Sequence, residues 1–303
     1  MPRHNAVGLL RHRRPTLATS KQRSFQPGTT FRFSVYRDLK CTLGQINVAV
    51  EIAELAMRSF ESQARVAPSA DVFIKQMSST HGIRVDSLDL PAAALHMHHF
   101  YIVSVHQQFE TFLKGFKKEH PLTTWVNLDD NSLLKNVLSS FAPRQYNEML
   151  EAIGRLELDI ADYYRNVRNA VAHGDDKNSA QSTLRLRTRV QDPMSVYVRL
   201  PAPNRFAQTN FDDFILFTRA VKHIALALCT VARPTDPQIV EMILRVDLTG
   251  SSGIDLSILR KRKRRPEALR NALGTLLRIK YGLDRSEAQP IVDLLLSGPQ
   301  ALR

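Results

Sequence analysis

The chain of 303 residues carries 42 Lys and Arg side chains against 29 Asp and Glu, which gives a formal net charge of +13. This excess indicates a polyanionic partner, and nucleic acid fits it better than a membrane surface does. No uninterrupted apolar run approaches the roughly 18 residues of a membrane span, so we expect no membrane partner. The two cysteines, Cys41 and Cys229, lie far apart without metal-ligand spacing, which favours a reduced, cytoplasmic setting.

The first segment, residues 1–37, contains many arginines among Ser, Thr and Pro and has no acidic residue. A stretch of this composition cannot bury enough apolar surface to fold alone. We therefore expect a disordered basic arm that binds nucleic acid. An organellar transit peptide or translated upstream sequence has the same composition, although a transit peptide would also need a long amphipathic face, which is missing.

Residues 38–234 have the apolar periodicity of a helical bundle. Asp89 and Pro91 are typical of the start of a helix, the first as a cap and the second in the first turn. Pro143 precedes another long periodic segment, which we predict to be one helix ending at His173. Helices are expected at about 43–65, 70–79, 91–118, 131–142, from soon after 143 to 173, and 211–231.

Between the last two of these helices the pattern changes. Residues 184–190 and 194–200 alternate apolar with polar side chains, and Gln191-Asp192-Pro193 between them is typical of a turn. This pattern predicts a β-hairpin over 184–200. The remaining segment, 235–303, predicts a small basic helical unit with helices near 236–246, 255–280 (broken at Pro266) and 285–297. The predicted fold is mainly α: a bundle with a hairpin insertion and a C-terminal helical unit.

The most informative stretch is the end of the helix that leads to His173. Its apolar side chains recur at the helical period and predict a buried stripe made of Ile153, Leu156, Ile160, Tyr164, Val167 and Val171. Asn169 and His173 are four residues apart, so they lie on one polar face, with Arg165 and Arg168 beside it. Gly174 follows His173 as a helix-ending glycine does. A guanidinium, an amide and an imidazole thus share one helix end, where a phosphate can bind.

The pattern Arg168, Asn169 and, four residues later, His173 resembles the signature of the HEPN superfamily, in which Arg is followed by a polar residue and, after four to six positions, by His. The resemblance covers about residues 92–232, where the helix order fits that four-to-five-helix bundle. It implies a homodimer with the two motifs in one cleft, where RNA is cut without a metal or another cofactor. HEPN toxins that a partner nucleotidyltransferase silences carry Tyr two residues after the His; here that position is Asp175, which argues against that mode of silencing.

The resemblance implies an endoribonuclease from a bacterial toxin, defence or stress system, whose antitoxin or effector partner stays unknown. In such a reaction the ribose 2′-hydroxyl attacks the adjacent phosphate. Imidazole can exchange a proton near neutral pH, so His173 is the candidate acid or base. Arg168 would neutralise the charge of the transition state, and Asn169 would orient the imidazole. The products would be a 2′,3′-cyclic phosphate and a 5′-hydroxyl.

Two other interpretations stay open. The motif can be a structural helix end, where Arg binds carbonyl groups and His interacts with the helix dipole, in a non-catalytic RNA- or protein-binding module. The chain can also be a DNA-binding regulator that uses residues 255–297. Phosphate-binding loops, nucleophile elbows and dinucleotide fingerprints do not occur in the sequence, which excludes those enzyme classes.

The remaining polar clusters have simpler interpretations. The run Arg260, Lys261, Arg262, Lys263, Arg264 and Arg265 predicts a phosphate-binding ridge, with a purely solvated face as the alternative. The group His96, His98, His99 and His106 lacks the spacing of a zinc site, so we expect these imidazoles to line a cleft or face solvent. The pairs Asp129-Asp130, Asp175-Asp176 and Asp212-Asp213 stand where helix caps belong.

Overall fold

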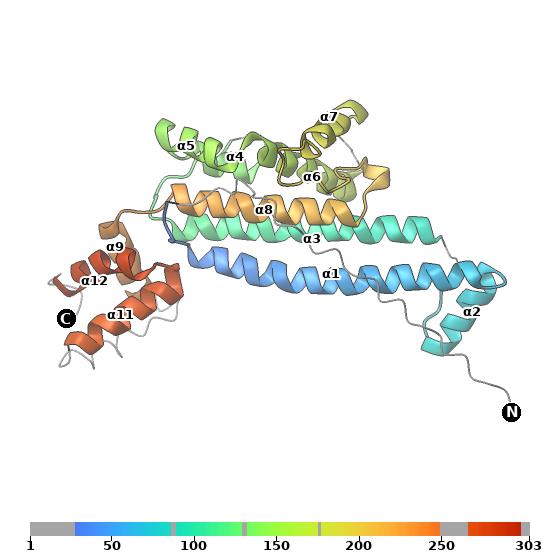
Figure 1. Cartoon of the computed structure of the whole chain (residues 1–303), viewed down its shortest axis with the longest axis horizontal. Helices are drawn as coiled ribbons and strands as arrows, with labels where there is room; N and C mark the ends of the chain where they lie inside the picture. Colours follow the sequence, from blue (N-terminus) through green and yellow to red (C-terminus); the bar gives the residue numbers. More distant parts are fainter. Residues whose placement is uncertain (1–27, 86–88, 129–131, 175–176, 249–265, 298–303) are drawn as a thin grey trace.

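The computed structural model describes residues 28–85, 89–128, 132–174, 177–248 and 266–297, without the side chains of 245–248. Within these ranges the protein has 11 α-helices and no strand. The prediction of a mainly α fold is therefore confirmed. The helices form a long layered bundle, with a small unit of three helices at one end (Figure 1).

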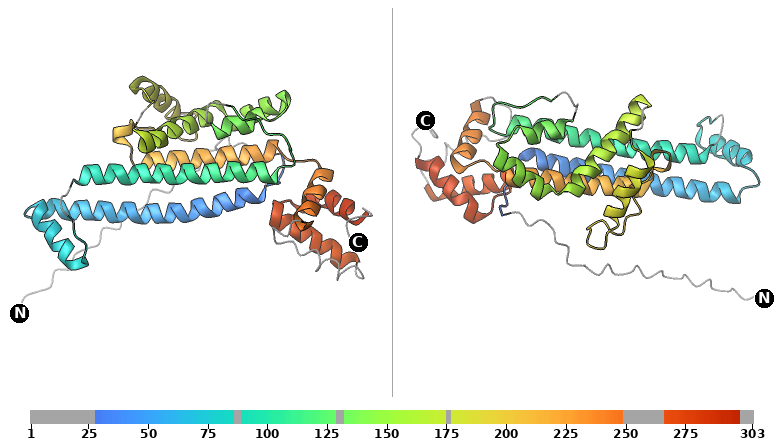
Figure 2. Two further views of the ribbon diagram at one scale, coloured as in Figure 1. Left: turned by 180° about the vertical axis from the view of Figure 1, so that it is seen from behind. Right: turned by 90° about the horizontal axis from the view of Figure 1, so that it is seen from above.

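Three long helices make the centre of the bundle: α1 (Ser34–Val66), α3 (Leu90–Glu119) and α8 (Phe211–Val231). The backbone N–H of Ala92 donates to the Asp89 side chain at 2.9 Å, which confirms the predicted cap of α3. Asn210 and Asp213 form a capping box at the start of α8, so a capping role for Asp213 is also confirmed. The short α2 (Ala70–His81) folds back beside the far end of α1 (Figures 1 and 2).

Helix α8 is long and apolar enough to span a membrane by length and composition. Its position explains this composition, because α8 packs against α1, α3, α5 and α6. Phe214, Phe217, Val221 and Ile224 on this helix are fully buried. A helix that is apolar on every side is expected at the centre of a bundle.

The helices α4 (Leu133–Ser139), α5 (Pro143–Ile153) and α6 (Arg155–His173) cover one side of this centre. The prediction of one helix from Pro143 to His173 is wrong, because Gly154 has φ +86° and separates α5 from α6. Ile153 is buried but belongs to α5. On α6, Ile160, Tyr164 and Val167 are fully buried as predicted, whereas Leu156 and Val171 are half-buried.

The predicted β-hairpin over 184–200 is also wrong. Residues 180–190 form helix α7 (Ala180–Val190), and 191–200 form successive turns. The Ser179 side chain caps α7 by accepting from Ser182 N at 3.0 Å. Thr183, Leu186 and Val190 face inward, whereas Leu184 is exposed. The burial therefore follows the 3.6-residue period of a helix, and the alternation of Leu184 and Leu186 was a coincidence of spacing.

The arm predicted over 1–37 extends too far toward the C-terminus. Phe31 and Phe33 have no exposed surface, and α1 begins at Ser34. Arg32 N donates to the Tyr281 carbonyl at 2.6 Å, and the Glu287 carboxylate accepts from Thr30 N at 2.9 Å. Residues 29–33 thus connect the bundle to the C-terminal helices α9 (Asp236–Leu248), α11 (Pro266–Tyr281) and α12 (Arg285–Ser297). Residues 1–27 lie outside the described part of the chain.

Candidate active site

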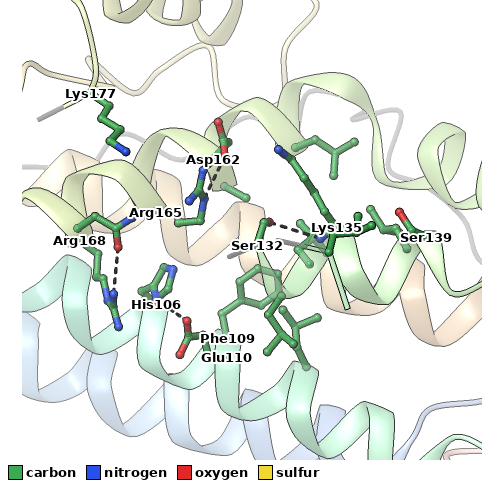
Figure 3. A pocket seen from close by; sticks show the side chains of 18 of the residues that line it. His106, Phe109, Glu110, Ser132, Lys135, Ser139, Asp162, Arg165, Arg168 and Lys177 are labelled. Atoms are coloured by element: carbon green, nitrogen blue, oxygen red, sulfur yellow. Dashed lines mark hydrogen bonds and ion pairs between the residues drawn. The ribbon is translucent and has the colours of Figure 1, made fainter. Parts of the chain in front are cut away.

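Arg165 and the three motif residues Arg168, Asn169 and His173 line one cavity of about 610 Å³. The sequence placed Arg165, Arg168, Asn169 and His173 at one helix end, and the structure brings all four to the same hollow between α3, α4 and α6. Lys177, just beyond the helix, adds a further positive charge to the rim (Figure 3). The other predicted nucleic-acid-binding residues, 260–265, lie outside the described residues.

The position of α6 depends on the buried carboxylate of Asp213. The Tyr164 hydroxyl donates to Asp213 Oδ1 at 2.8 Å, and Asn204 donates to the same carboxylate from its backbone N and its side chain, both at 2.8 Å. Burial raises the pKa of Asp213, although these hydrogen bonds oppose the shift. Because this carboxylate joins α8, α6 and the loop at residue 204, it holds the motif helix against the centre of the bundle.

The segment after α6 is tied back to the same helix. Gly174 has φ +78°, and its N–H donates to the Ala170 carbonyl at 2.7 Å, so the predicted helix-ending glycine is confirmed. The Asn178 side chain donates to the Tyr163 carbonyl at 3.0 Å and accepts from Asn166 at 3.2 Å. These contacts bring Lys177 over the cavity and leave the His173 side chain exposed at its edge.

The two arginines of the cavity have different partners. Arg165 donates twice to Asp162 Oδ1, at 3.1 and 2.8 Å, so a neighbouring negative charge offsets its positive charge. Arg168 donates from Nη1 to the neutral Asn169 side-chain carbonyl at 3.0 Å. Asn169 therefore orients the guanidinium of Arg168, whereas the sequence suggested that it orients the imidazole. Among the described residues, no carboxylate forms an ion pair with Arg168.

His106 of α3 is a further polar residue of this cavity, which the sequence did not single out as a site residue. Its residue surface is 6% exposed, and Nδ1 lies 3.8 Å from Glu110 Oε1. Figure 3 shows the imidazole beside the Arg168 side chain, with the Glu110 carboxylate close to the ring. Burial lowers the pKa of His106 well below 6.5; Glu110 opposes this shift, and Arg168 and Arg165 add to it. The expectation that the α3 histidines line a cleft or face solvent is confirmed for His106 and wrong for His98 and His99, which are buried.

The other end of the cavity is mainly apolar. Phe109 and Leu113 of α3 face Leu133 and Leu138 of α4, and Tyr146, Leu150 and Leu158 complete this part. Lys135 and Ser139 of α4 lie at its margin. The cavity therefore offers cations and imidazoles at one end and an apolar surface at the other, a combination that suits an anion attached to a less polar group.

The remaining histidines of α3 have other partners. His98 Nε2 lies 3.0 Å from Glu54 Oε2, and His99 Nε2 lies 3.0 Å from the Phe206 carbonyl. Among the described residues, no three His, Cys, Asp or Glu side chains come together as a metal site. Asp129-Asp130 and Asp175-Asp176, which we expected to cap helices, lie outside the described ranges.

No protein-family model, no curated protein and no solved structure matches this chain. The resemblance to the HEPN superfamily therefore depends on the Arg168–His173 spacing and the order of the helices.

Proposed function

We propose that the protein is a metal-independent endoribonuclease that cuts RNA by attack of a ribose 2′-hydroxyl on the adjacent phosphate. The observation that carries this proposal is the shared cavity of Arg165, Arg168, Asn169 and His173. Separate helix-end roles for these side chains would not require them to face one hollow. The charge of +13 supports a polyanionic substrate.

The proposed chemistry uses groups that the cavity contains. Arg168, held by the Asn169 amide, binds the scissile phosphate and stabilises the extra charge of the pentacovalent transition state. His173 at the open edge exchanges a proton with one of the two ribose oxygens. Lys177 and Arg165 attract the flanking phosphates. This route needs no metal, because the nucleophile belongs to the substrate.

The biological setting and the assembly are proposals from the HEPN resemblance alone. They are a bacterial toxin, defence or stress system in the cytoplasm, and a homodimer that brings two motifs together. The exposed position of His173 is compatible with a second copy facing it.

A non-catalytic RNA-binding module is the main alternative, since an anion site needs only the arginines. A buried imidazole behind the arginines favours the enzyme, because binding alone gains little from a neutral base. The DNA-binding alternative is less favoured. The exposed positions at and before α12 include Asp284 and Asp293 as well as Arg285, which weakens their attraction to phosphate.

The test is to incubate the purified protein with end-labelled RNA in the presence of EDTA and to analyse the new ends. We expect 2′,3′-cyclic phosphate and 5′-hydroxyl ends, and no cutting at a position whose 2′-hydroxyl is replaced by hydrogen. Cutting that requires a metal and leaves 5′-phosphate ends would contradict the proposal. Binding without cutting would favour the non-catalytic module.

A further inference from the structure

We infer that His106 is a second proton-transfer group of this site: it takes the proton of the attacking 2′-hydroxyl, while His173 gives a proton to the departing 5′-oxygen. The inference rests on the proposed ribonuclease function. It deepens that function by assigning the base and the acid to different residues of one chain.

His106 lines the cavity from the side of α3. The ring lies at the α3 wall, and Arg165 and Arg168 of α6 act on it electrostatically. His173 lies five residues after Arg168 on α6, about 7.5 Å farther along the helix axis. A phosphate on Arg168 would thus have an imidazole on the α3 side and another toward the open edge. In-line displacement has the attacking and leaving oxygens on opposite sides of phosphorus, so a base and an acid that approach from different sides suit it.

Charged groups and an aromatic ring surround the His106 imidazole. Glu110 and Lys114 lie on its own helix, Arg165 and Arg168 approach from α6, and α8 presents the Phe217 ring at 6.4 Å. The cations and the burial keep the imidazole neutral at pH 7, so a lone pair is ready to accept a proton. Glu110 near Nδ1 provides the partner that orients a base and stabilises its protonated form. A bound phosphate would offset the arginine charges and make protonation of His106 easier.

The proton balance of the step is complete. The 2′-oxygen forms a bond to phosphorus as its proton passes to His106, and the bond from phosphorus to the 5′-oxygen breaks as His173 supplies a proton. The products are a cyclic phosphate and a 5′-hydroxyl. Exchange with water returns both imidazoles to their starting states, and no oxidant, reductant or metal takes part.

The test compares His106→Gln with His99→Gln, a matched control. His99 is on the same helix, is similarly buried and also has a pKa lowered by burial, but it lies outside the cavity. We expect His106→Gln to lower kcat/KM by about 100-fold, within the range for general base catalysis, and to remove the acidic limb of the pH profile. The kcat/KM of the wild-type protein should rise with pH through about 4, the lowered pKa of His106, as this imidazole loses its proton. His99→Gln should keep the wild-type profile.

A second substrate separates the base from the acid. RNA with a bridging sulfur in place of the 5′-oxygen has a leaving group that needs no proton. His173→Ala should recover most of its rate on this RNA, and His106→Gln should not. If His106→Gln alone regained its cleavage rate on this RNA, the assignment of His106 as the base and His173 as the acid would be overturned.

The possible failures can be told apart. Wild-type protein that cuts RNA with no acidic limb, or with His106→Gln as active as wild type, would overturn this inference and leave the proposed function standing. Wild-type protein that cuts no RNA would overturn both. If His106→Gln does not fold, the acidic limb of the wild-type profile remains the deciding measurement.

Discussion

At the scale of single residues, Arg165 and Arg168 lie three residues apart on the same helix, but their side chains have different partners. Arg165 forms an ion pair with Asp162, and its side chain is 24% exposed. Arg168 donates only to a neutral amide in the described contacts of its side chain. Since a carboxylate partner reduces the attraction of a guanidinium for phosphate, Arg168 should bind the scissile phosphate more strongly.

We therefore predict that Arg168→Ala lowers kcat by about 100-fold or more and that Arg165→Ala lowers it by a smaller factor. Single-turnover cleavage at saturating RNA would measure both. Arg155→Ala is the control, because Arg155 is exposed on the same helix and outside the cavity. Equal losses for the two cavity arginines would contradict the distinction between their charges.

His173 has a close structural counterpart elsewhere in the chain. It ends α6 and precedes Gly174, and His81 likewise ends α2 and precedes Gly82 at φ +65°. Both imidazoles are exposed at a helix C-terminus, so any stabilisation by the helix dipole should be similar, at most about 1 kcal/mol. Comparing alanine variants of His173 and His81 therefore separates a catalytic role of His173 from a structural one.

His173→Ala should abolish cleavage, while His81→Ala should leave it unchanged. Both variants should keep nearly wild-type stability in urea denaturation. A fully active His173→Ala protein would exclude the proposed chemistry. Unfolding of that variant, with His81→Ala stable, would support a structural role for His173.

The sequence predicted part of this site for a clear reason. Arg165, Arg168, Asn169 and His173 are neighbours on one helix, so local periodicity was enough to group them. His106 comes from α3, about 60 positions earlier in the chain, and only the packing of α3 against α6 brings it into the cavity. The sequence did hold one signal for His106. It lies beside Val105 and three residues before Phe109, both buried, so it is a histidine on an apolar helix face.

At the scale of elements, the predictions were reliable where a helix is long and capped. α3 has the predicted cap Asp89, and the predicted Asp213 completes the capping box of α8, whose N-cap is Asn210. Both helices lie within one or two residues of the predicted limits. The errors at Gly154 and α7 have physical causes. A single glycine in an otherwise helical pattern does not reveal its φ. A short helix with an exposed Leu184 has the same alternation as a strand.

Gly154 provides a test of how the motif helix is positioned. Its φ of +86° and ψ of 143° are unfavourable for any side chain, and an added Cβ would lie 2.5 Å from Glu157 Oε2. Glu157 also accepts a hydrogen bond from the Tyr197 hydroxyl at 3.2 Å, which a displaced carboxylate would lose.

Gly154→Ala should therefore reduce the free energy of unfolding by about 2 kcal/mol. Gly44→Ala is the control, because Gly44 is inside α1 and an added Cβ there contacts nothing within 4 Å. That change should raise stability by about 0.5–1 kcal/mol. Urea denaturation measures both values, and a neutral Gly154→Ala would show that α5 and α6 can continue as one helix.

At the scale of the whole molecule, the side chains that line the cavity decide whether the proposed chemistry requires a dimer. A motif with one imidazole would need a second copy to supply both an acid and a base, and a two-fold axis would bring that copy to the same cleft. His106 supplies the second imidazole from the same chain. A homodimer stays a proposal from the family resemblance, and light scattering tests it independently of the chemistry.

The charge of the molecule is the remaining feature with a testable role. The run 260–265 contributes six positive charges in the sequence and directly precedes α11 (Pro266–Tyr281), within the same C-terminal segment that residues 29–33 connect to the bundle. We propose that it binds RNA at phosphates away from the cut site, so it should influence affinity rather than rate.

Replacement of all six residues by Gln should weaken RNA binding and flatten its salt dependence. Each lost phosphate contact lowers the slope of log K against log salt by about 0.7 for single-stranded RNA, so six contacts would lower it by about 4. Fluorescence anisotropy in the His173→Ala background measures this with intact RNA. A variant with three of the six charges restored should show about half of the change. The cleavage rate at saturating RNA should stay nearly that of the wild type; normal binding with loss of cutting would show that the basic run belongs to the catalytic site.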